Sequence, residues 1–265
     1  RPRAERDSMQ TQWRALSTTE IARLSEQGCT CDDWSRVQVA DGFRADRVRA
    51  TRFGGDVRLG VFDRDVSFLG GVTKPAGISD ATIHNCTIGD NVFICAVRNY
   101  IANYVIEDGA VIDNIDLLAV DGPSAFGNGT RVAVVNEAGG RDIPIYDQLC
   151  AHTAYVLAFY RHRPRVIEKL KAMIEGYVAS IRSSMGLVAR GARIANSRLL
   201  RNVRIGPAAV IEGVNRLENG SVNSCVEDPV YIGPGVYADD FIVCSGATIT
   251  RSEEHTSELQ SRQSI

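Results

Sequence analysis

Long apolar runs are missing from this sequence. The longest, Ala154 to Tyr160, is far shorter than the roughly 20 residues that a helix needs to cross a bilayer. Neither end carries a positively charged segment followed by an apolar stretch and a small-residue cleavage site, which is the pattern of an export signal. We therefore expect a cytoplasmic protein with no membrane partner.

Clusters of basic residues are missing as well. The chain of 265 residues holds 30 Lys and Arg against 32 Asp and Glu, for a formal net charge of −2. This balance argues against a nucleic-acid partner. With 44% hydrophobic and 23% charged residues, the composition is that of a globular protein with one large domain or two ordinary ones.

Cysteine pairs at metal-binding spacing are also absent. The seven cysteines are scattered, and only Thr30 separates Cys29 from Cys31, with no second Cys or His pair at a usual distance. We expect reduced structural thiols and no disulfides. A group of acids has no recognisable metal-ligand spacing either, so we expect no metal site; these acids are Asp113, Asp116 and Asp121.

The two ends of the chain differ from the rest. Met9 fits a natural initiator, so residues 1–8 are interpreted as upstream read-through. Residues 251–265, RSEEHTSELQSRQSI, lose every upstream pattern and resemble the translation of a sequencing adaptor. We expect neither segment to contribute to function, and relatives to continue beyond Thr250.

Residues 9–77 predict a short helix followed by strands. Ser17 and Glu20 form the pattern of a capping box, and Gly28 ends the helix. Glycines then punctuate β-branched and aromatic stretches such as DVRLGVF and VSFLGG, which indicates short strands joined by tight turns.

From residue 78 onward, apolar residues recur every six positions, in two stretches over residues 78–135 and 185–250. The series are Ile106, Ile112, Leu118; Val120, Phe126, Val132; Ile205, Ile211, Leu217; and Tyr231, Tyr237, Val243, Ile249. Four fragments share one template of an aliphatic residue, Gly or an acid, two turn positions and a small or β-branched residue: IGDNVF (88–93), IEDGAV (106–111), IGPAAV (205–210) and IGPGVY (232–237). A period of six indicates a β-solenoid whose aliphatic residues point inward.

These fragments resemble the hexapeptide repeats of left-handed parallel β-helix proteins, which include bacterial acyltransferases and the acyltransferase domains of sugar nucleotidyltransferases. The resemblance implies a mainly β fold, a left-handed parallel β-helix with a helical insertion and a short N-terminal helix. The left hand comes from the resemblance, because general rules favour right-handed crossovers. Similar enzymes place their active sites between the subunits of a trimer, so a homo-oligomer is expected.

A closer resemblance covers most of residues 9–250. The strings TIHNCTIGDN, FGNGTRVAVVNEAGGRDIPIYDQL, AYVLAFYRHRP and NVRIGPAAVIEG are similar to an uncharacterised family of Bacteroides-type bacteria. Some of its members are labelled UDP-N-acetylglucosamine pyrophosphorylase-related. The glycine-rich pyrophosphorylase motif is absent here.

Residues 136–184 interrupt the period of six. The spacing of Val166, Leu170, Ile174, Tyr177 and Ile181 predicts a helix, with Pro164 in its first turn, and Leu149 to Tyr160 form another apolar helical stretch. We expect a helical hairpin packed against one face of the solenoid.

Departures from a repeat usually carry function, which directs attention to residues 136–152. We predict ligand binding here by Asn136, Glu137, Gly139, Gly140, Arg141, Asp142, Tyr146 and Asp147. Arg141 could hold a phosphate or carboxylate, and the glycine amides could approach an anion. The alternative is a connecting loop whose polar residues cap the following helix, with Asp147 near the start of that helix.

His84 and His152 are the candidate catalytic residues. In similar acyltransferases a histidine acts as the general base, and an imidazole titrates near neutrality. The alternative for each is a surface or turn histidine. Several asparagines recur near predicted turns, where they could form hydrogen-bonded ladders: Asn85, Asn91, Asn99, Asn103 and Asn114.

Two functions from different classes follow. The first is a sugar or nucleotide-sugar transferase of the acyltransferase type, with a nucleotide-sugar or acyl-coenzyme A as substrate. The second is a non-catalytic scaffold or ligand-binding module. Fold alone does not decide between them, and no cofactor is indicated.

Overall fold

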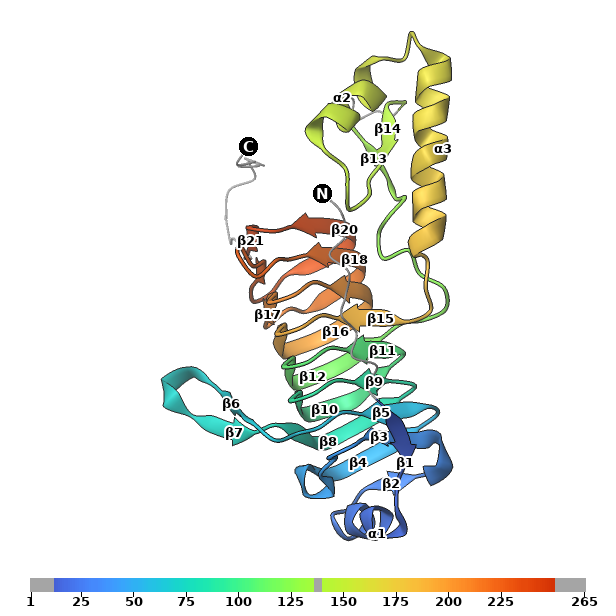
Figure 1. The fold of residues 1–265 in the computed structure, drawn as a ribbon. Helices are drawn as coiled ribbons and strands as arrows, with labels where there is room; N and C mark the ends of the chain where they lie inside the picture. The colour runs from blue at the N-terminus through green and yellow to red at the C-terminus, as the bar shows by residue number, and fades with distance from the viewer. Residues whose placement is uncertain (1–11, 136–139, 251–265) are drawn as a thin grey trace.

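The structure is mainly β, and its strands stack along one axis with a small helical unit beyond one end (Figure 1). It is a computed structural model that describes residues 12–135 and 140–250. The expectations for residues 1–8 and 251–265 concern segments outside the described residues.

Seventeen strands form one large mixed sheet, in which every pairing is parallel except the antiparallel pair of β1 with β3. The strands are β1 (Trp13–Ala15), β2 (Thr30–Cys31), β3 (Val37–Ala40), β4 (Val48–Gly54), β5 (Val57–Leu59), β8 (Gly77–His84), β9 (Thr87–Ile88), β10 (Phe93–Ala102), β11 (Tyr104–Ile106), β12 (Val111–Ala119), β15 (Gly186–Val188), β16 (Arg193–Ile205), β17 (Val210–Glu212), β18 (Arg216–Asn223), β19 (Tyr231–Ile232), β20 (Tyr237–Cys244) and β21 (Thr248–Ile249).

The parallel pairings align these strands into three columns. Column one aligns Val48, Ile78, Ile94, Ile112, Ile194, Ile211, Ile232 and Ile249. Column two aligns Cys31, Phe53, Ile83, Ile101, Leu118, Leu200, Leu217 and Ala238. Column three aligns Val39, Leu59, Ile88, Ile106, Val188, Ile205, Val222 and Val243. Most of these side chains are buried in one core cluster, so each column contributes a continuous apolar file.

The aliphatic residue that opens each template fragment is buried, as predicted: Ile88, Ile106, Ile205 and Ile232 are at most 1% exposed. The last predicted series is wrong at Tyr237, which is 68% exposed. Tyr231 pairs with Val210 and Tyr237 with Arg216, so these first two members are displaced by one residue from the buried files, whereas Val243 and Ile249 lie in columns three and one. Since side chains alternate between faces of a strand, that displacement turns Tyr237 outward.

Asparagines form ladders at the bends between columns, as predicted. Asn85 donates to Asn103 over 3.3 Å, and Asn202 donates to Asn219 over 3.1 Å. These four residues have φ between 48° and 61°, a left-handed conformation that asparagine tolerates better than most residues. The ladder therefore fixes the bends and satisfies their side chains together.

A helix, α1 (Thr18–Glu26), covers the end of the stack next to β2 (Figure 1). The predicted capping box is present: Glu20 N–H donates to Ser17 Oγ, and Ser17 N–H donates to a Glu20 carboxylate oxygen. Arg14 also donates to Glu20, and together these hydrogen bonds lower the pKa of Glu20 to about 2. Leu24 on the inner face of α1 is fully buried in the core of the stack.

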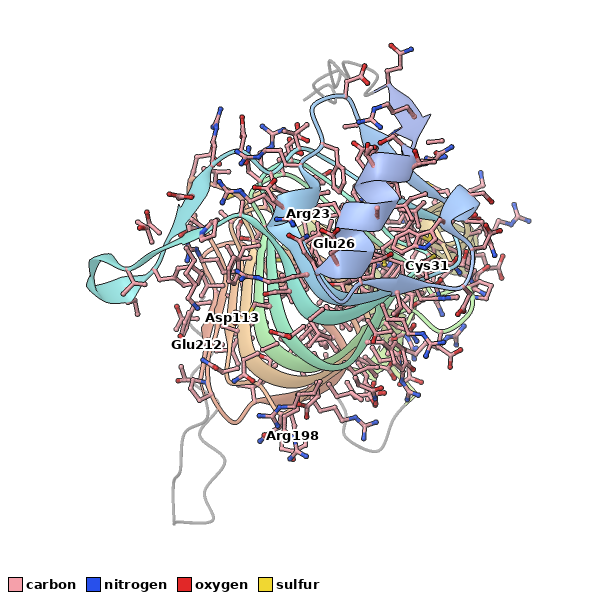
Figure 2. All side chains as sticks on the ribbon, turned by 90° about the horizontal axis from the view of Figure 1, so that it is seen from below. Arg23, Glu26, Cys31, Asp113, Arg198 and Glu212 are labelled. Carbon is pink, nitrogen blue, oxygen red and sulfur yellow. The ribbon has the colours of Figure 1, made fainter. Side chains whose placement is uncertain are left out.

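A β-hairpin, here called the arm, leaves the stack between β5 and β8. It consists of β6 (Asp65–Ser67), β7 (Thr73–Pro75) and a short 3-10 turn at Leu69–Gly71, where sequence indicated only strands. Gly70 and Gly71 both have positive φ, which reverses the chain at the tip. The arm projects sideways from the stack (Figures 1 and 2).

The insertion consists of a second hairpin and two helices: β13 (Arg131–Ala133), β14 (Asp142–Pro144), α2 (Ala151–Phe159) and α3 (Pro164–Ile181). We expected the helices to pack against a face of the stack. Instead, their buried residues Leu157 and Ile174 form a separate small core with Ile143 of β14. The hairpin supplies the apolar surface that the helices cover.

All seven cysteines are free thiols, which confirms the expectation of no disulfides. Among residues 12–135 and 140–250, no helix combines the length and the apolar character that crossing a membrane requires.

Candidate functional site

A pocket of about 460 Å³ lies in the insertion, between α3 and the β13–β14 hairpin. We call it the insertion pocket. Ile174 and Val178 of α3 and Pro144 of β14 supply apolar lining, and the charged lining comes from Arg131, Lys171, Glu175 and Arg182. Its volume falls in the range of about 300–1,000 Å³ that is usual for small-molecule sites.

Three cationic side chains face one acidic side chain in this pocket. None of these four residues makes an ion pair with another residue that the structure describes. A guanidinium or ammonium without a carboxylate partner is available to an anionic ligand, and Arg in particular can bind a phosphate with two parallel hydrogen bonds. The pocket can therefore hold a phosphate or carboxylate group.

The helix α3 presents Lys171 and Glu175 to the pocket because of its periodicity, and Arg182 is the residue that directly follows the helix. Residues three or four positions apart lie on one helix face, so Lys171 and Glu175 flank the buried Ile174. The predicted start of this helix is confirmed, since Pro164 occupies its first turn.

Gly129 allows the loop before β13 to approach α3 closely. A Cβ atom on Gly129 would lie 3.2 Å from a methyl carbon of Val178, and its φ of +90° favours glycine. A larger residue here would push the loop away from the helix and widen the pocket.

The insertion is fixed to the stack by a polar contact around Asn128. Its side chain donates to Ser221 Oγ over 3.1 Å and accepts from Asp147 N–H over 2.7 Å. Asp147 in turn accepts a 2.5 Å hydrogen bond from Tyr177 Oη of α3. Partial burial and this carboxylate raise the pKa of Tyr177 to about 12.

The alternative in which Asp147 caps the next helix is wrong. The N-cap of α2 is Cys150, and the carboxylate of Asp147 is engaged by Tyr177. Asp147 therefore connects α3 with the stack.

The other predicted binding residues that the structure describes lie on or beside the hairpin and do not line the pocket. Asn136, Glu137 and Gly139 lie outside the described residues. Gly140 has a φ of +84°, and Arg141 and Asp142 are half-buried at the turn end of the hairpin. The pocket uses the opposite end, where Arg131 pairs with Pro144. Tyr146 packs against the small core and stacks edge-on with Tyr177.

The structure does not bring His84 and His152 together. His84 ends β8 on the stack, where its ring lies over Gly54, and a Cβ on that glycine would be 2.8 Å from His84 Nδ1. His152 is exposed in the first turn of α2, far from β8 along the molecule (Figure 1). Neither histidine lines the insertion pocket.

A second, larger hollow of about 780 Å³, here called the arm groove, lies between the arm and column one. Its floor is made of outward-facing residues next to the buried isoleucines, among them Asp113, Arg193 and Glu212. Asp113 and Glu212 lie on the side of the stack from which the arm projects (Figure 2).

The charges of the arm groove are largely engaged already. Lys74 lies 3.8 Å from Asp113 and 4.8 Å from the ring centre of Phe68, and Arg193 donates to the carbonyl of Ser67 over 3.0 Å. These contacts attach the arm to the stack. The insertion pocket is therefore the better candidate for an anionic ligand.

Within the described part of the chain, no group of three or more His, Cys, Asp or Glu side chains is arranged to hold a metal ion. Asp113 and Asp116 instead pair with basic side chains, Lys74 for the first and Arg98 and Arg198 for the second.

Reasoning from sequence missed Arg131, Lys171 and Arg182. The helical spacing predicts the apolar face that contains Ile174, but it does not mark Lys171 as a pocket residue. Only the position of the hairpin against α3 turns that surface into a pocket wall, and this position depends on contacts between distant segments.

Comparison with known families assigns the chain to a family. A family model described as a domain of unknown function, DUF4954, matches residues 13–258. The chain belongs to the DUF4954 family. This confirms membership of an uncharacterised family and adds no reaction to it.

One relative is an uncharacterized protein of Treponema pallidum (strain Nichols). It is 30% identical over 250 residues, which cover 89% of this chain and 34% of the relative. The chain thus spans about a third of the length of the curated relative that it matches.

Proposed function

We propose that this part of a DUF4954 protein binds a small phosphate-bearing ligand in the insertion pocket. The observation that carries the proposal is the set of three cationic side chains, Arg131, Lys171 and Arg182, around a pocket of small-molecule size. None of the three makes an ion pair with an acidic residue in the described part of the chain. A doubly charged ligand matches that excess of positive charge.

Two ligand classes meet this requirement, nucleotide-sugars and acyl-coenzyme A. We favour a nucleotide-sugar, because its diphosphate lies between two ring systems that can contact Ile174, Val178 and Pro144 on the apolar lining. Acyl-coenzyme A adds a long flexible arm that would extend beyond a pocket of about 460 Å³.

Binding is favoured over transfer as the role of this region. A transferase needs a general base within hydrogen-bond reach of the reacting group, and neither His84 nor His152 lines the pocket. Glu175 is the acidic residue of the lining, and it is the residue to test if turnover is found.

We further propose that the three columns are the faces of a left-handed parallel β-helix built from hexapeptide repeats. The buried files and the six-residue step from Ile106 to Ile112 to Leu118 support this interpretation, since these residues fall in columns three, one and two in turn. The hand follows from the resemblance of the fragments. A homo-oligomer, specifically a trimer, and a cytoplasmic location are proposed on the same resemblance and on the sequence.

Isothermal titration with UDP-N-acetylglucosamine and with acetyl-coenzyme A tests the proposal. The double variant Arg131→Ala/Lys171→Ala should weaken nucleotide-sugar binding by about a hundredfold, or tenfold for each charged contact removed. Lys169→Ala is the matched control, because this exposed lysine of α3 does not line the pocket.

Arg141→Ala separates the pocket from the binding loop expected from sequence. If Arg141→Ala weakens binding and the double variant does not, the site is the hairpin turn and not the pocket. If neither ligand binds the unmodified chain, the proposed function is wrong.

A further inference from the structure

The outer end of the insertion exposes a cluster of aromatic side chains. Tyr155, Phe159 and Tyr160 are 56%, 47% and 42% exposed. Their rings contact one another, with centroids 5.0 Å apart for Tyr155 and Phe159 and 6.0 Å apart for Tyr155 and Tyr160. Single exposed apolar residues are ordinary, whereas a contiguous group marks an interaction surface.

Cationic side chains adjoin this cluster. Arg161, Arg163 and Arg165 are exposed where α2 ends and α3 begins, and the ring of His162 lies 5.5 Å from that of Tyr160. Residues 148–167 contain no Asp or Glu. None of the three arginines makes an ion pair with another described residue. We call these four residues and the three aromatic ones the insertion tip.

The insertion tip lies at the outermost point of the molecule. In Figure 1 the connection between α2 and α3 is at the end of the helical unit that faces away from the stack. A projecting, convex end can contact a broad flat surface, while it cannot surround a strand of nucleic acid in a groove.

We propose that the insertion tip binds the surface of a membrane that contains anionic phospholipid. Arginines are attracted to anionic headgroups, and tyrosine, with an apolar ring and a polar hydroxyl, suits the interface between headgroups and acyl chains. The tip combines both kinds of side chain without acidic residues to oppose them. This is surface attachment, which needs no membrane-spanning segment, so the proposal replaces the expectation of no membrane partner. It is independent of the ligand proposed for the insertion pocket.

Sedimentation of the full chain with lipid vesicles tests the inference. Binding is expected to vesicles of phosphatidylcholine mixed with phosphatidylserine, and it should fall at least about tenfold with phosphatidylcholine alone or at high salt. Arg161→Glu/Arg163→Glu should abolish the charge-dependent binding, and Tyr155→Ser/Phe159→Ser should weaken it at every salt concentration.

Arg49→Glu/Arg64→Glu is the matched control, because it makes the same change of net charge at exposed positions distant from the insertion. Far-ultraviolet circular dichroism establishes that each variant is folded. The inference is overturned if the unmodified chain does not sediment with anionic vesicles, or if the control loses as much binding as the tip variants. It is also overturned if single-stranded RNA competes fully for the tip.

Discussion

Cys150 shows how one position in the fold changes the chemistry of a side chain. It is the exposed N-cap of α2, and its sulfur lies 3.3 Å from Thr153 Oγ1. Hydrogen bonds from Thr153, with a smaller contribution from His152, lower the pKa of Cys150 to about 7. Burial has the opposite effect on Cys86 and raises its pKa to about 12. The expectation of structural thiols therefore suits Cys86 but not Cys150.

Alkylation with iodoacetamide should single out Cys150. Because the thiolate is the reactive form, its labelling rate should rise to half its maximum near pH 7, below the ordinary midpoint of about 8.5 for cysteine. Mass spectrometry of labelled peptides over a pH series measures this. Cys244 is the exposed comparator, and Cys86 should stay unlabelled in the folded protein. A midpoint for Cys150 equal to that of an unfolded peptide would contradict the prediction.

At the scale of elements, the bends between columns are what hold the stack in register. Asn202 has a φ of 55°, accepts from Asp121 N–H over 2.8 Å and donates to Asn219. The two hydrogen bonds need the amide group of Asn202, and asparagine tolerates the positive φ better than most residues do. Alanine removes the hydrogen bonds and is strained at positive φ, whereas glycine removes only the hydrogen bonds.

Asn202→Ala should therefore cost about 2 kcal/mol of the free energy of unfolding and Asn202→Gly about 1 kcal/mol. Urea denaturation followed by circular dichroism measures both. Asn99→Ala is the control, since Asn99 is exposed in β10 and is not among the residues with positive φ; its change should be close to zero. A glycine variant less stable than the alanine variant would show that the backbone conformation is not the cause.

The sequence predicted the buried files because the spacing of apolar residues along the chain determines which side chains point into the core. The six-residue spacing of Ile205, Ile211 and Leu217 is maintained by three fully buried side chains. The prediction failed at Tyr237, where the stretch between Ile211 and Ile232 is longer than the corresponding stretches before and after it and the register shifts. The template fragment that begins at Ile232 marked the correct inward residue, whereas the spacing of six counted from Tyr231 did not.

The insertion pocket could not be predicted from the sequence, for a different reason. The sequence predicts a departure from the repeat at residues 136–184, whereas the strands of the stack end at Ala119 and resume at Gly186; the helix from Pro164 was confirmed. How the hairpin lies on α3 depends on contacts among Ile143, Leu157 and Ile174, which are far apart in sequence. Such packing is a property of the whole unit and not of any one segment.

At the scale of the whole molecule, the insertion occupies a single bend. Columns two and three are joined by one residue in neighbouring coils, as Asn103 joins Ala102 to Tyr104 and Asn202 joins Arg201 to Val203. Residues 120–185 stand between the equivalent positions Ala119 and Gly186.

A variant in which one asparagine replaces residues 120–185 should therefore fold. It loses Phe126, which is buried against the stack, so we expect it to be less stable by about 3 kcal/mol while still unfolding cooperatively. Circular dichroism during thermal unfolding measures this. The same variant should lose both ligand and vesicle binding. A chain without cooperative unfolding would mean that the stack depends on the insertion for its folding.

The cap formed by α1 also has a bearing on how the molecule is made. Each strand of the stack finds its partners mainly in adjacent coils, so a growing chain can add coils one after another onto a surface that already exists. α1, with Leu24 buried beneath the first described strands, offers one such surface. If strands are added in the order of synthesis, only the unpaired edges of the last strands added are exposed to aggregation at any moment.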